Sequence, residues 1–171
     1  MLDNVLDSYG SIFHSDQQLG QLMKRRAGVG IDVSNIRPKG QNVKNSAKTT
    51  DGISVFMERF SNTCREVAQG GRRGALLLSI NVHHPEVLTF INIKKDRKKV
   101  TGANCSVKLT DKFLKAVENN EEYALINHQG KEIKRALLSD IIHFAYSLEN
   151  KILTFSLEDS NSNHLNYTFK L

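Results

Sequence analysis

The chain has 171 residues and a formal net charge of +6, with 39% hydrophobic and 25% charged residues. This length and composition are typical of a soluble globular domain or of a part of a larger one. No apolar run approaches the ~20 residues that a bilayer-spanning helix needs, so the sequence argues against a membrane protein. Two cysteines, Cys64 and Cys105, lie in segments with apolar patterning, which predicts buried thiols in a reducing, cytoplasmic compartment.

The basic charge suggests an anionic partner. The lysines and arginines are spread along the whole chain, however, and they are not interleaved with aromatic residues as in proteins that bind single-stranded nucleic acid. The densest basic run, residues 94–99, is most simply a solvated loop. We therefore expect neither nucleic acid nor a membrane among the partners.

The first part of the chain predicts a helix, a strand and a long loop. Residues 8–25 have helical spacing of apolar side chains, and Asp7 and Ser8 supply capping oxygens at the start. Glycines open a short strand at residues 28–33. Residues 35–50 are polar and irregular in pattern, and a basic loop of this length with little core-forming sequence is often functional.

A second helix, a glycine–arginine turn and a strand follow. Residues 53–68 show the clearest 3.6-residue spacing in the chain, which predicts an amphipathic helix. The turn at residues 69–75 reads QGGRRGA, and residues 75–80 form an apolar strand pattern. Adjacent glycines let a backbone approach a ligand closely, and arginines offer forked donors to phosphate. A nucleotide-binding loop and a solvated helix-to-strand connection are both compatible with this turn.

The later segments alternate between helical and strand patterns. In chain order we expect a helix at 87–93 after a His-His-Pro-Glu turn, a strand at 104–109, a helix at 113–117 capped by Thr110 and Asp111, a strand at 123–127, a helix at 133–148, and strands at 152–156 and 165–169. This alternation predicts an α/β fold with parallel strand pairing. Without an internal repeat or a convincing linker, residues 1–171 are expected to form one domain or part of one.

A catalytic site is hard to build from these residues. His83 and His84 lack further metal ligands at a familiar spacing, so a surface turn is favoured over a metal site. The two cysteines fit packed thiols better than nucleophiles. Four acidic residues are expected to be helix caps or solvent-facing charges: Asp16, Asp51, Glu58 and Glu66. We therefore predict no catalytic residue and no metal ligand in this chain.

The loops do offer groups that bind anions. Basic side chains lie in both loops: Arg37, Lys39, Lys44 and Lys48 in the first, and Arg72 and Arg73 in the second. If both loops face one ligand, a nucleotide fits, with its ribose hydroxyl on Asp7 and its phosphates on Arg37 and Lys44. A solvated basic loop is the alternative.

Short motifs occur in a fixed order along the chain. They are RAGVGID at 26–32, IRPKG at 36–40, FMERFSNT at 56–63, QGGRRGA at 69–75, HPE at 84–86 and KVTGAN at 99–104. The ordered set resembles the large, catalytic subunit of ribonucleotide reductase. The resemblance is close over residues 1–118 and weak over residues 119–171.

The resemblance implies a partial ten-stranded α/β barrel with an allosteric specificity site at a dimer interface. The helices at 8–25 and 53–68 would pack against their copies in a second subunit. By this resemblance, the sugar of a deoxynucleoside triphosphate or ATP effector is held by Asp7 and Ser8, and its phosphates are held by Arg37 and Lys44. The specificity loop, which carries effector identity to the substrate base, corresponds to Gln69, Gly70, Gly71, Arg72 and Arg73. Gly28 corresponds to a backbone position beside the substrate.

The resemblance also implies chemistry outside the chain. The family's redox cysteine precedes the Asp-Ser motif and its thiyl-radical cysteine lies in an Asn-Pro-Cys loop, and neither Cys64 nor Cys105 fits these contexts. The chain therefore resembles a fragment of ribonucleoside-diphosphate reductase that binds no cofactor directly and is inactive alone. The implied partners are nucleotides, a second large subunit or the rest of the catalytic subunit, a thioredoxin-type reductant, and a radical source, either a small metal-containing subunit or cobalamin. The alternatives are a catalytically inactive fragment that binds nucleotide or pairs with a large subunit, and a fragment that does not fold alone.

Overall fold

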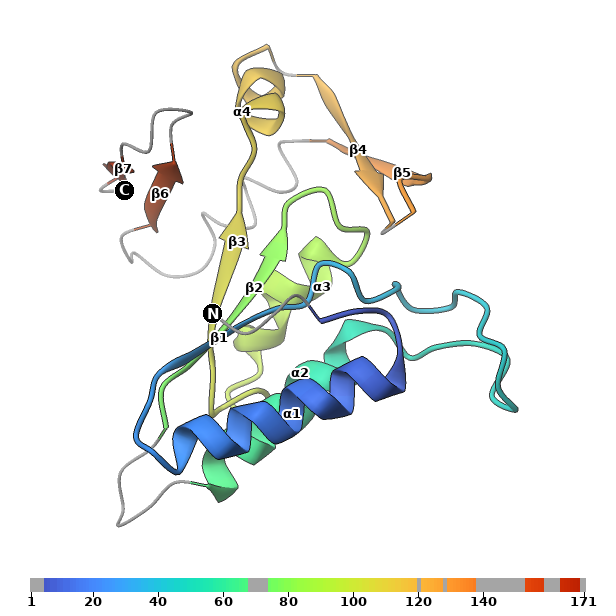
Figure 1. Ribbon diagram of the computed structural model, residues 1–171. Coiled ribbons are helices and arrows are strands. Elements are labelled where there is room, and N and C mark those ends of the chain that lie inside the picture. The colour runs from blue at the N-terminus through green and yellow to red at the C-terminus, as the bar shows by residue number, and fades with distance from the viewer. Residues whose placement is uncertain are drawn as a thin grey trace. The chain divides into compact units, whose positions relative to one another are not determined.

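The computed structural model of the chain describes residues 5–67, 74–119, 121–127, 129–137, 153–158 and 164–169 (Figure 1). The chain divides into two compact units. Unit 1 comprises Met1–Lys108 and Ala124–Arg135, and unit 2 comprises Leu109–Tyr123 and Ala136–Leu171. Within the described residues, every helix is too short or too polar to cross a bilayer.

A three-stranded parallel sheet forms the centre of unit 1. Its order is β1–β2–β3, with β1 at Val29–Asp32, β2 at Leu76–Asn81 and β3 at Asn104–Lys108. In the register, Ile31 pairs with Leu78, and Leu78 pairs in turn with Cys105. The predicted α/β pattern with parallel pairing is confirmed for these strands. The sheet of these described residues is open rather than closed into a barrel.

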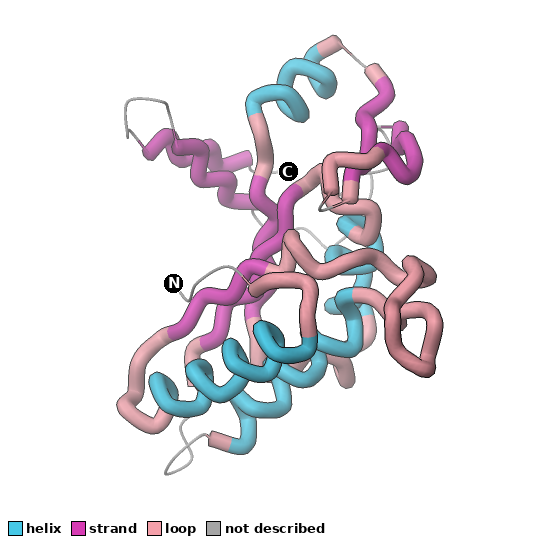
Figure 2. The backbone as a smooth tube through the Cα atoms, turned by 45° about the vertical axis from the view of Figure 1, so that its right-hand side comes forward, coloured by secondary structure: helices cyan, strands magenta, loops and turns pink. Residues whose placement is uncertain are grey.

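Helices of unit 1 cover one face of this sheet (Figure 2). They are α1 at Tyr9–Met23, α2 at Ile53–Glu66 and α3 at Val87–Asn92, and a 3₁₀ helix, η1, follows at Ile93–Lys95. The core lies between the helices and the sheet, where Leu78 and Ile80 are fully buried. Leu77 points to the opposite face and is 45% exposed, as the alternation of side chains along a strand requires.

The helices α1 and α2 lie side by side (Figures 1 and 2). Asp16 of α1 accepts a hydrogen bond of 2.6 Å from the hydroxyl of Thr63, and it lies 2.8 Å from Nη2 of Arg59, both on α2. The side chain is buried, because Asp16 is only 8% exposed. The expectation that Asp16 is a cap or a solvent-facing charge is therefore wrong. A carboxylate can lie between two packed helices when it is paired and hydrogen-bonded.

A turn at residues 96–103 packs against α2. Oε2 of Glu58 accepts a hydrogen bond of 2.6 Å from the backbone N–H of Val100, and the hydroxyl of Ser61 accepts one of 2.9 Å from the N–H of Gly102. A Cβ at Gly102 would lie 2.4 Å from the carbonyl oxygen of Ser61, so glycine permits this close approach. Glu58 thus anchors the KVTGAN motif, which corrects the expectation of a purely solvent-facing charge.

A further two-stranded sheet consists of β4 at Glu122–Ile126 and β5 at Glu132–Leu137. The predicted helix at 133–148 is therefore wrong for residues 133–137, and residues 138–148 lie outside the described part of the chain. In the connection, Oδ1 of Asn127 accepts hydrogen bonds of 3.0 and 2.9 Å from the backbone N–H groups of Gln129 and Lys131. This side-chain bonding favours a tight turn between strands over the start of a helix.

Unit 2 contains a helix and a hairpin. The helix α4 spans Asp111–Glu118, and the hydroxyl of Thr110 caps it by accepting a hydrogen bond of 3.2 Å from Phe113. The strands β6 at Leu153–Glu158 and β7 at His164–Phe169 confirm the last two predicted strands. They pair antiparallel, which differs from the expected parallel pairing. A parallel connection needs a dozen or more residues, and residues 159–163 are too few.

Candidate functional site

The candidate site begins where α1 starts. Ser8 is the N-cap residue, with an extended backbone and a hydroxyl that accepts a hydrogen bond of 3.1 Å from the N–H of Ser11. The cap holds Asp7 directly before the helix, where the positive end of the helix dipole favours an anionic group. The Asp7 side chain is 15% exposed, so its carboxylate is largely shielded from solvent.

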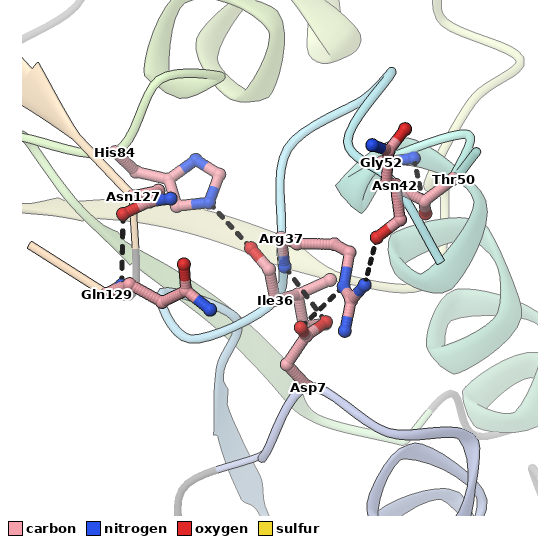
Figure 3. Close-up of polar contacts among 9 residues, drawn as sticks. All are labelled: Asp7, Ile36, Arg37, Asn42, Thr50, Gly52, His84, Asn127 and Gln129. Atoms are coloured by element: carbon pink, nitrogen blue, oxygen red, sulfur yellow. Dashed lines mark hydrogen bonds and ion pairs between the residues drawn. The ribbon is translucent and has the colours of Figure 1, made fainter. Parts of the chain in front are cut away.

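Asp7 pairs with Arg37, 30 residues later in the sequence (Figure 3). Nε of Arg37 lies 2.5 Å from Oδ2 of Asp7, and the backbone N–H of Arg37 donates to Oδ1 over 3.1 Å. Nη1 donates to the carbonyl oxygen of Asn42 over 2.5 Å. The structure thus brings two predicted site residues together by pairing them with each other. A guanidinium has five N–H donors, and the Arg37 side chain is 27% exposed, so part of it can reach a ligand.

The loop that follows Arg37 is a short hairpin rather than an irregular segment. Asn42 and Thr49 form an antiparallel bridge, and the N–H of Val43 donates to the carbonyl of Lys48 over 2.8 Å. Lys44, the second predicted phosphate ligand, lies beyond this bridge and is exposed to solvent. We call residues 37–50 the basic hairpin.

The predicted specificity loop, Gln69, Gly70, Gly71, Arg72 and Arg73, lies outside the described residues. Its flanks are described, however. Val67 ends α2, and a Cβ at Gly74 would lie 2.8 Å from Sδ of Met23 at the end of α1. Both flanks therefore lie at the carboxyl ends of α1 and α2, whereas the basic hairpin lies at their amino ends. The 14 residues of α2 extend over about 20 Å, which separates these described flanks from the start of α2, where the basic hairpin ends.

Gly28 lies at the same end as Gly74. The N–H of Val29 donates to the carbonyl of Ala75 over 2.9 Å, and a Cβ at Gly28 would lie 3.7 Å from Cβ of Ala75. This is an ordinary van der Waals contact, and Gly28 is exposed. Packing within the described chain therefore does not require a glycine at this position.

The sequence analysis missed two groups that hold the basic hairpin. Glu86 accepts hydrogen bonds from the backbone N–H groups of Lys39 in the hairpin and of Ile53 just after it, and Nε2 of His84 bonds to the carbonyl of Ile36 over 2.8 Å (Figure 3). His84 is 1% exposed, so the interpretation as a surface turn is wrong for this residue. One signal was available in the sequence. Gly52 precedes α2 and has no side chain to cap it, so an acceptor has to come from elsewhere.

Polar side chains also join the carboxyl ends of the parallel strands. Oδ1 of Asp32 accepts hydrogen bonds of 2.5 and 3.0 Å from the hydroxyl and N–H of Ser34, and Oδ2 pairs with the ammonium group of Lys108. Burial and, to a smaller degree, the charge of Lys108 lower the pKa of His83, against an opposing effect of Asp32. This network fixes the start of the segment that leads from β1 to the basic hairpin.

Neither cysteine is suited to nucleophilic or redox chemistry in this environment. Cys64 is 1% exposed and burial raises its pKa, and burial also raises the pKa of Cys105 to about 11. A thiol with a raised pKa carries little thiolate at neutral pH. Within the described ranges, no group of three or more His, Cys, Asp and Glu residues could hold a metal ion. The described residues thus offer one oriented guanidinium, that of Arg37, held by Asp7 and the carbonyl of Asn42 near the start of α1.

Comparison with known families identifies the fold family. A family model described as "Ribonucleotide reductase, barrel domain" matches residues 1–159. The chain belongs to the ribonucleotide reductase family. The resemblance carried by the ordered motifs is thereby confirmed, and the ribonucleotide reductase match extends beyond residue 118, where the motifs are weak.

Curated ribonucleotide reductases are similar over most of this chain. The vitamin B12-dependent ribonucleoside-diphosphate reductase of Mycobacterium tuberculosis is 34% identical over 134 residues, which are 77% of this chain and 19% of that protein. The protein of the same name from Thermoplasma acidophilum is 33% identical over 135 residues, or 78% of this chain and 18% of the relative. The ribonucleoside-diphosphate reductase large subunit of Arabidopsis thaliana is 29% identical, covering 70% of this chain and 15% of its own length. The chain thus spans less than a fifth of these relatives.

Proposed function

We propose that this chain carries the allosteric specificity site of a ribonucleoside-diphosphate reductase large subunit. The whole protein would reduce ribonucleotides to deoxyribonucleotides by radical chemistry, and β1–β3 would form part of its ten-stranded barrel. The observation that supports the proposal best is the contact of Arg37 with Asp7, which joins the start of α1 to the basic hairpin.

The proposed effector is a deoxynucleoside triphosphate or ATP. Asp7 accepts a hydrogen bond from a ribose hydroxyl, with Ser8 beside it, and the exposed part of the Arg37 guanidinium and the ammonium group of Lys44 bind phosphate oxygens. Asp7 and the carbonyl of Asn42 already orient the guanidinium. Less side-chain entropy is therefore lost when the phosphate binds.

A second copy of the chain would complete this site. On α1, Tyr9 and Phe13 are 55% and 46% exposed, and their rings stack at 5.5 Å. The guanidinium of Arg59 lies 4.5 Å from the centre of the Phe13 ring. Aromatic and arginine side chains of this kind are enriched in subunit interfaces. If α1 and α2 pair antiparallel with their copies, the basic hairpin of one chain meets the specificity loop of the other.

The specificity loop, residues 69–73, would carry the identity of the effector to the substrate. Its C-terminal flank adjoins Gly28, because β1 and β2 begin side by side with Val29 opposite Leu76. We place the substrate against the backbone of Gly28. This arrangement gives a short path from an effector at the dimer interface to a substrate at the amino end of the sheet.

The radical and the reducing electrons would come from outside this segment. The relatives from Mycobacterium and Thermoplasma are named as vitamin B12-dependent, and the relative from Arabidopsis is named as a large subunit. We therefore propose that cobalamin or a small metal-containing subunit supplies the radical elsewhere in a cytoplasmic enzyme, and that a thioredoxin-type protein supplies the electrons.

Nucleotide binding to three proteins tests the effector site. Calorimetry with dTTP, dGTP and ATP compares the wild type with Arg37→Ala and with Arg97→Ala, which removes the same charge from an exposed position. Loss of a phosphate contact costs about 1.5–3 kcal/mol, so Arg37→Ala should raise Kd roughly 10- to 150-fold. Arg97→Ala should change Kd only slightly. Equal losses in both variants, or no binding to the wild type at millimolar nucleotide, would contradict the proposal.

A further inference from the structure

We propose that Glu86 is a positioning residue for effector binding, because its carboxylate binds the backbone on both sides of Lys44, at Lys39 and at Ile53, and Lys39 follows Arg37 by only two residues. The effect on the effector rests on the proposed function, whereas the anchoring of the basic hairpin rests on the contacts of Glu86 alone. The resemblance to ribonucleotide reductase gives this residue no role.

One carboxylate oxygen of Glu86 binds the backbone near both ends of the basic hairpin. Oε2 of Glu86 accepts hydrogen bonds from the backbone N–H of Lys39 over 3.1 Å and of Ile53 over 3.0 Å. These two donors enclose most of the basic hairpin, and they lie 47 and 33 residues before Glu86 in the sequence. Glu86 is only 8% exposed. Bonds from N–H groups to a carboxylate shielded from water are stronger than those between neutral groups.

The second of these bonds also caps α2. Ile53 is the first residue of α2, and its N-cap residue Gly52 forms no side-chain cap. The carboxylate of Glu86 satisfies this N–H and places a negative charge at the positive end of the helix dipole. Gly52 has a φ of +80°, and a Cβ there would lie 2.4 Å from Oε2 of Glu86. Glycine at position 52 therefore permits the positive φ and leaves room for the carboxylate of Glu86.

The neighbouring His84 holds the other side of Arg37. The N–H of Glu86 donates to Nδ1 of His84 over 3.1 Å, so Nδ1 is the acceptor and Nε2 carries the proton. Nε2 then donates to the carbonyl of Ile36 over 2.8 Å (Figure 3). Arg37 thus lies between a residue bound by His84 and a residue bound by Glu86, both from one turn after β2.

This arrangement fixes the backbone from which the guanidinium reaches Asp7. Without the carboxylate of Glu86, the N–H groups of Lys39 and Ile53 lose this acceptor, and the bond of His84 to Ile36, before Arg37, remains. A nucleotide then binds only the fraction of molecules in which Arg37 and Lys44 lie in their bound arrangement. The apparent Kd rises in inverse proportion to that fraction.

Three variants of the full chain test the inference. Glu86→Ala removes both acceptor bonds, and Glu86→Gln keeps a carbonyl oxygen that can accept them. Glu58→Gln is the matched control, because Glu58 also accepts a backbone N–H, from Val100, without touching the basic hairpin. The measurements are hydrogen exchange at the amides of Lys39 and Ile53, trypsin cleavage after Lys44 and Lys48, and the Kd for dTTP.

We expect Glu86→Ala to accelerate exchange and cleavage within residues 39–53 and to raise the Kd for dTTP about tenfold, as when one molecule in ten has the bound arrangement. Glu86→Gln should restore most of the protection from exchange and cleavage and most of the affinity for dTTP. Glu58→Gln should leave all three measurements unchanged. If Glu86→Ala does not fold, Glu86→Gln takes its place: wild-type exchange and Kd support the acceptor role, and a raised Kd with wild-type exchange at Lys39 and Ile53, or faster exchange there with a wild-type Kd, overturns it. Unchanged exchange at Lys39 and Ile53 in Glu86→Ala, or faster exchange with an unchanged Kd, would overturn the inference. Failure of the wild type to bind dTTP would instead reject the proposed function, and the exchange measurement would still decide the anchoring.

Discussion

The carboxylate of Asp16 on α1 lies 2.8 Å from the guanidinium of Arg59 on α2, at a position where Asp16 is almost fully buried. The hydroxyl of Thr63 donates to the same carboxylate over 2.6 Å. The Arg59 side chain is 47% exposed, so solvent screens the ion pair and the hydrogen bond contributes most of the stabilisation. We expect Asp16→Ala to lower the free energy of unfolding by about 1–2 kcal/mol, as measured by urea denaturation.

A control distinguishes this effect from a general loss of charge. Glu132 pairs with Arg135 at a site where the side chains are 45% and 61% exposed. Exposed pairs contribute little, so Glu132→Ala should change the free energy of unfolding by no more than about 0.5 kcal/mol. Equal destabilisation by the two variants would refute a specific role for Asp16 between the helices.

If the exposed aromatic side chains of α1 form a dimer interface, their substitution should weaken self-association. Phe13 stacks on Tyr9 and carries the guanidinium of Arg59 on its ring. If this surface pairs with a second copy, Phe13→Ser should cost about 2 kcal/mol, or roughly 30-fold in the dimer dissociation constant. Sedimentation equilibrium measures this change, with Ile133→Ser as a control at another exposed apolar residue. An unchanged dimer dissociation constant in Phe13→Ser would exclude the α1 surface as the interface.

Gly28 provides a test that separates folding from substrate binding. A Cβ at this position meets Cβ of Ala75 at 3.7 Å, so Gly28→Ala should change the free energy of unfolding by less than about 0.5 kcal/mol. If the substrate lies against this backbone, the added methyl group should raise KM for the ribonucleotide in the full enzyme. Steady-state kinetics measure KM, and Gly10→Ala is the control, since a Cβ there meets no atom of the described residues within 4 Å. Identical kinetics in the two variants would argue against substrate at Gly28.

The buried carboxylate of Glu86 predicts a pH dependence of stability. Burial raises its pKa above the ordinary value of 4.5, and the hydrogen bonds from Ile53 and Lys39 oppose this shift less strongly. The folded state therefore binds the proton more tightly than the unfolded chain does. The part of the stability that comes from protonation of Glu86 is complete below pH 4.5 and is lost as the pH rises through the raised pKa of the folded state.

The variant Glu86→Gln removes this titration. The free energy of unfolding of the wild type, relative to that of Glu86→Gln, should decrease as the pH is raised from about 4 towards 7. Urea denaturation of both proteins at a series of pH values measures the difference. A difference that increases with pH would show that hydrogen bonding, rather than burial, dominates the pKa of Glu86.

Local pattern predicted the elements whose partners are near in sequence. The spacing of Ile53, Met57 and Phe60 predicted α2, and these side chains are fully buried. The pattern failed at residues 133–137, because apolar residues there fit both a helix face and a strand, and the turn at Asn127 decides between them. Parallel pairing was predictable for strands joined by helices, and it was wrong where a short connection joins β6 to β7.

The candidate site was predictable only where a motif marks it. Asp7 and Arg37 were both expected at the effector, but their contact with each other depends on the path of 30 residues between them. The role of Glu86 depends on bonds to residues 33 and 47 positions away, which no periodicity encodes. The burial of Asp16 was not predictable for the same reason. A polar residue on a helix is expected to be exposed unless the helix that packs against it is known.

The positive φ of Gly52 and its contact with Glu86 restrict how this part of the protein can change in evolution. A side chain at position 52 would occupy the space of the carboxylate, and it would require a backbone angle that residues other than glycine rarely adopt. The two positions should therefore vary together among homologues. Sequences that replace Gly52 should have a shorter side chain at position 86, and they should supply the start of α2 with a Ser, Asp or Asn of its own.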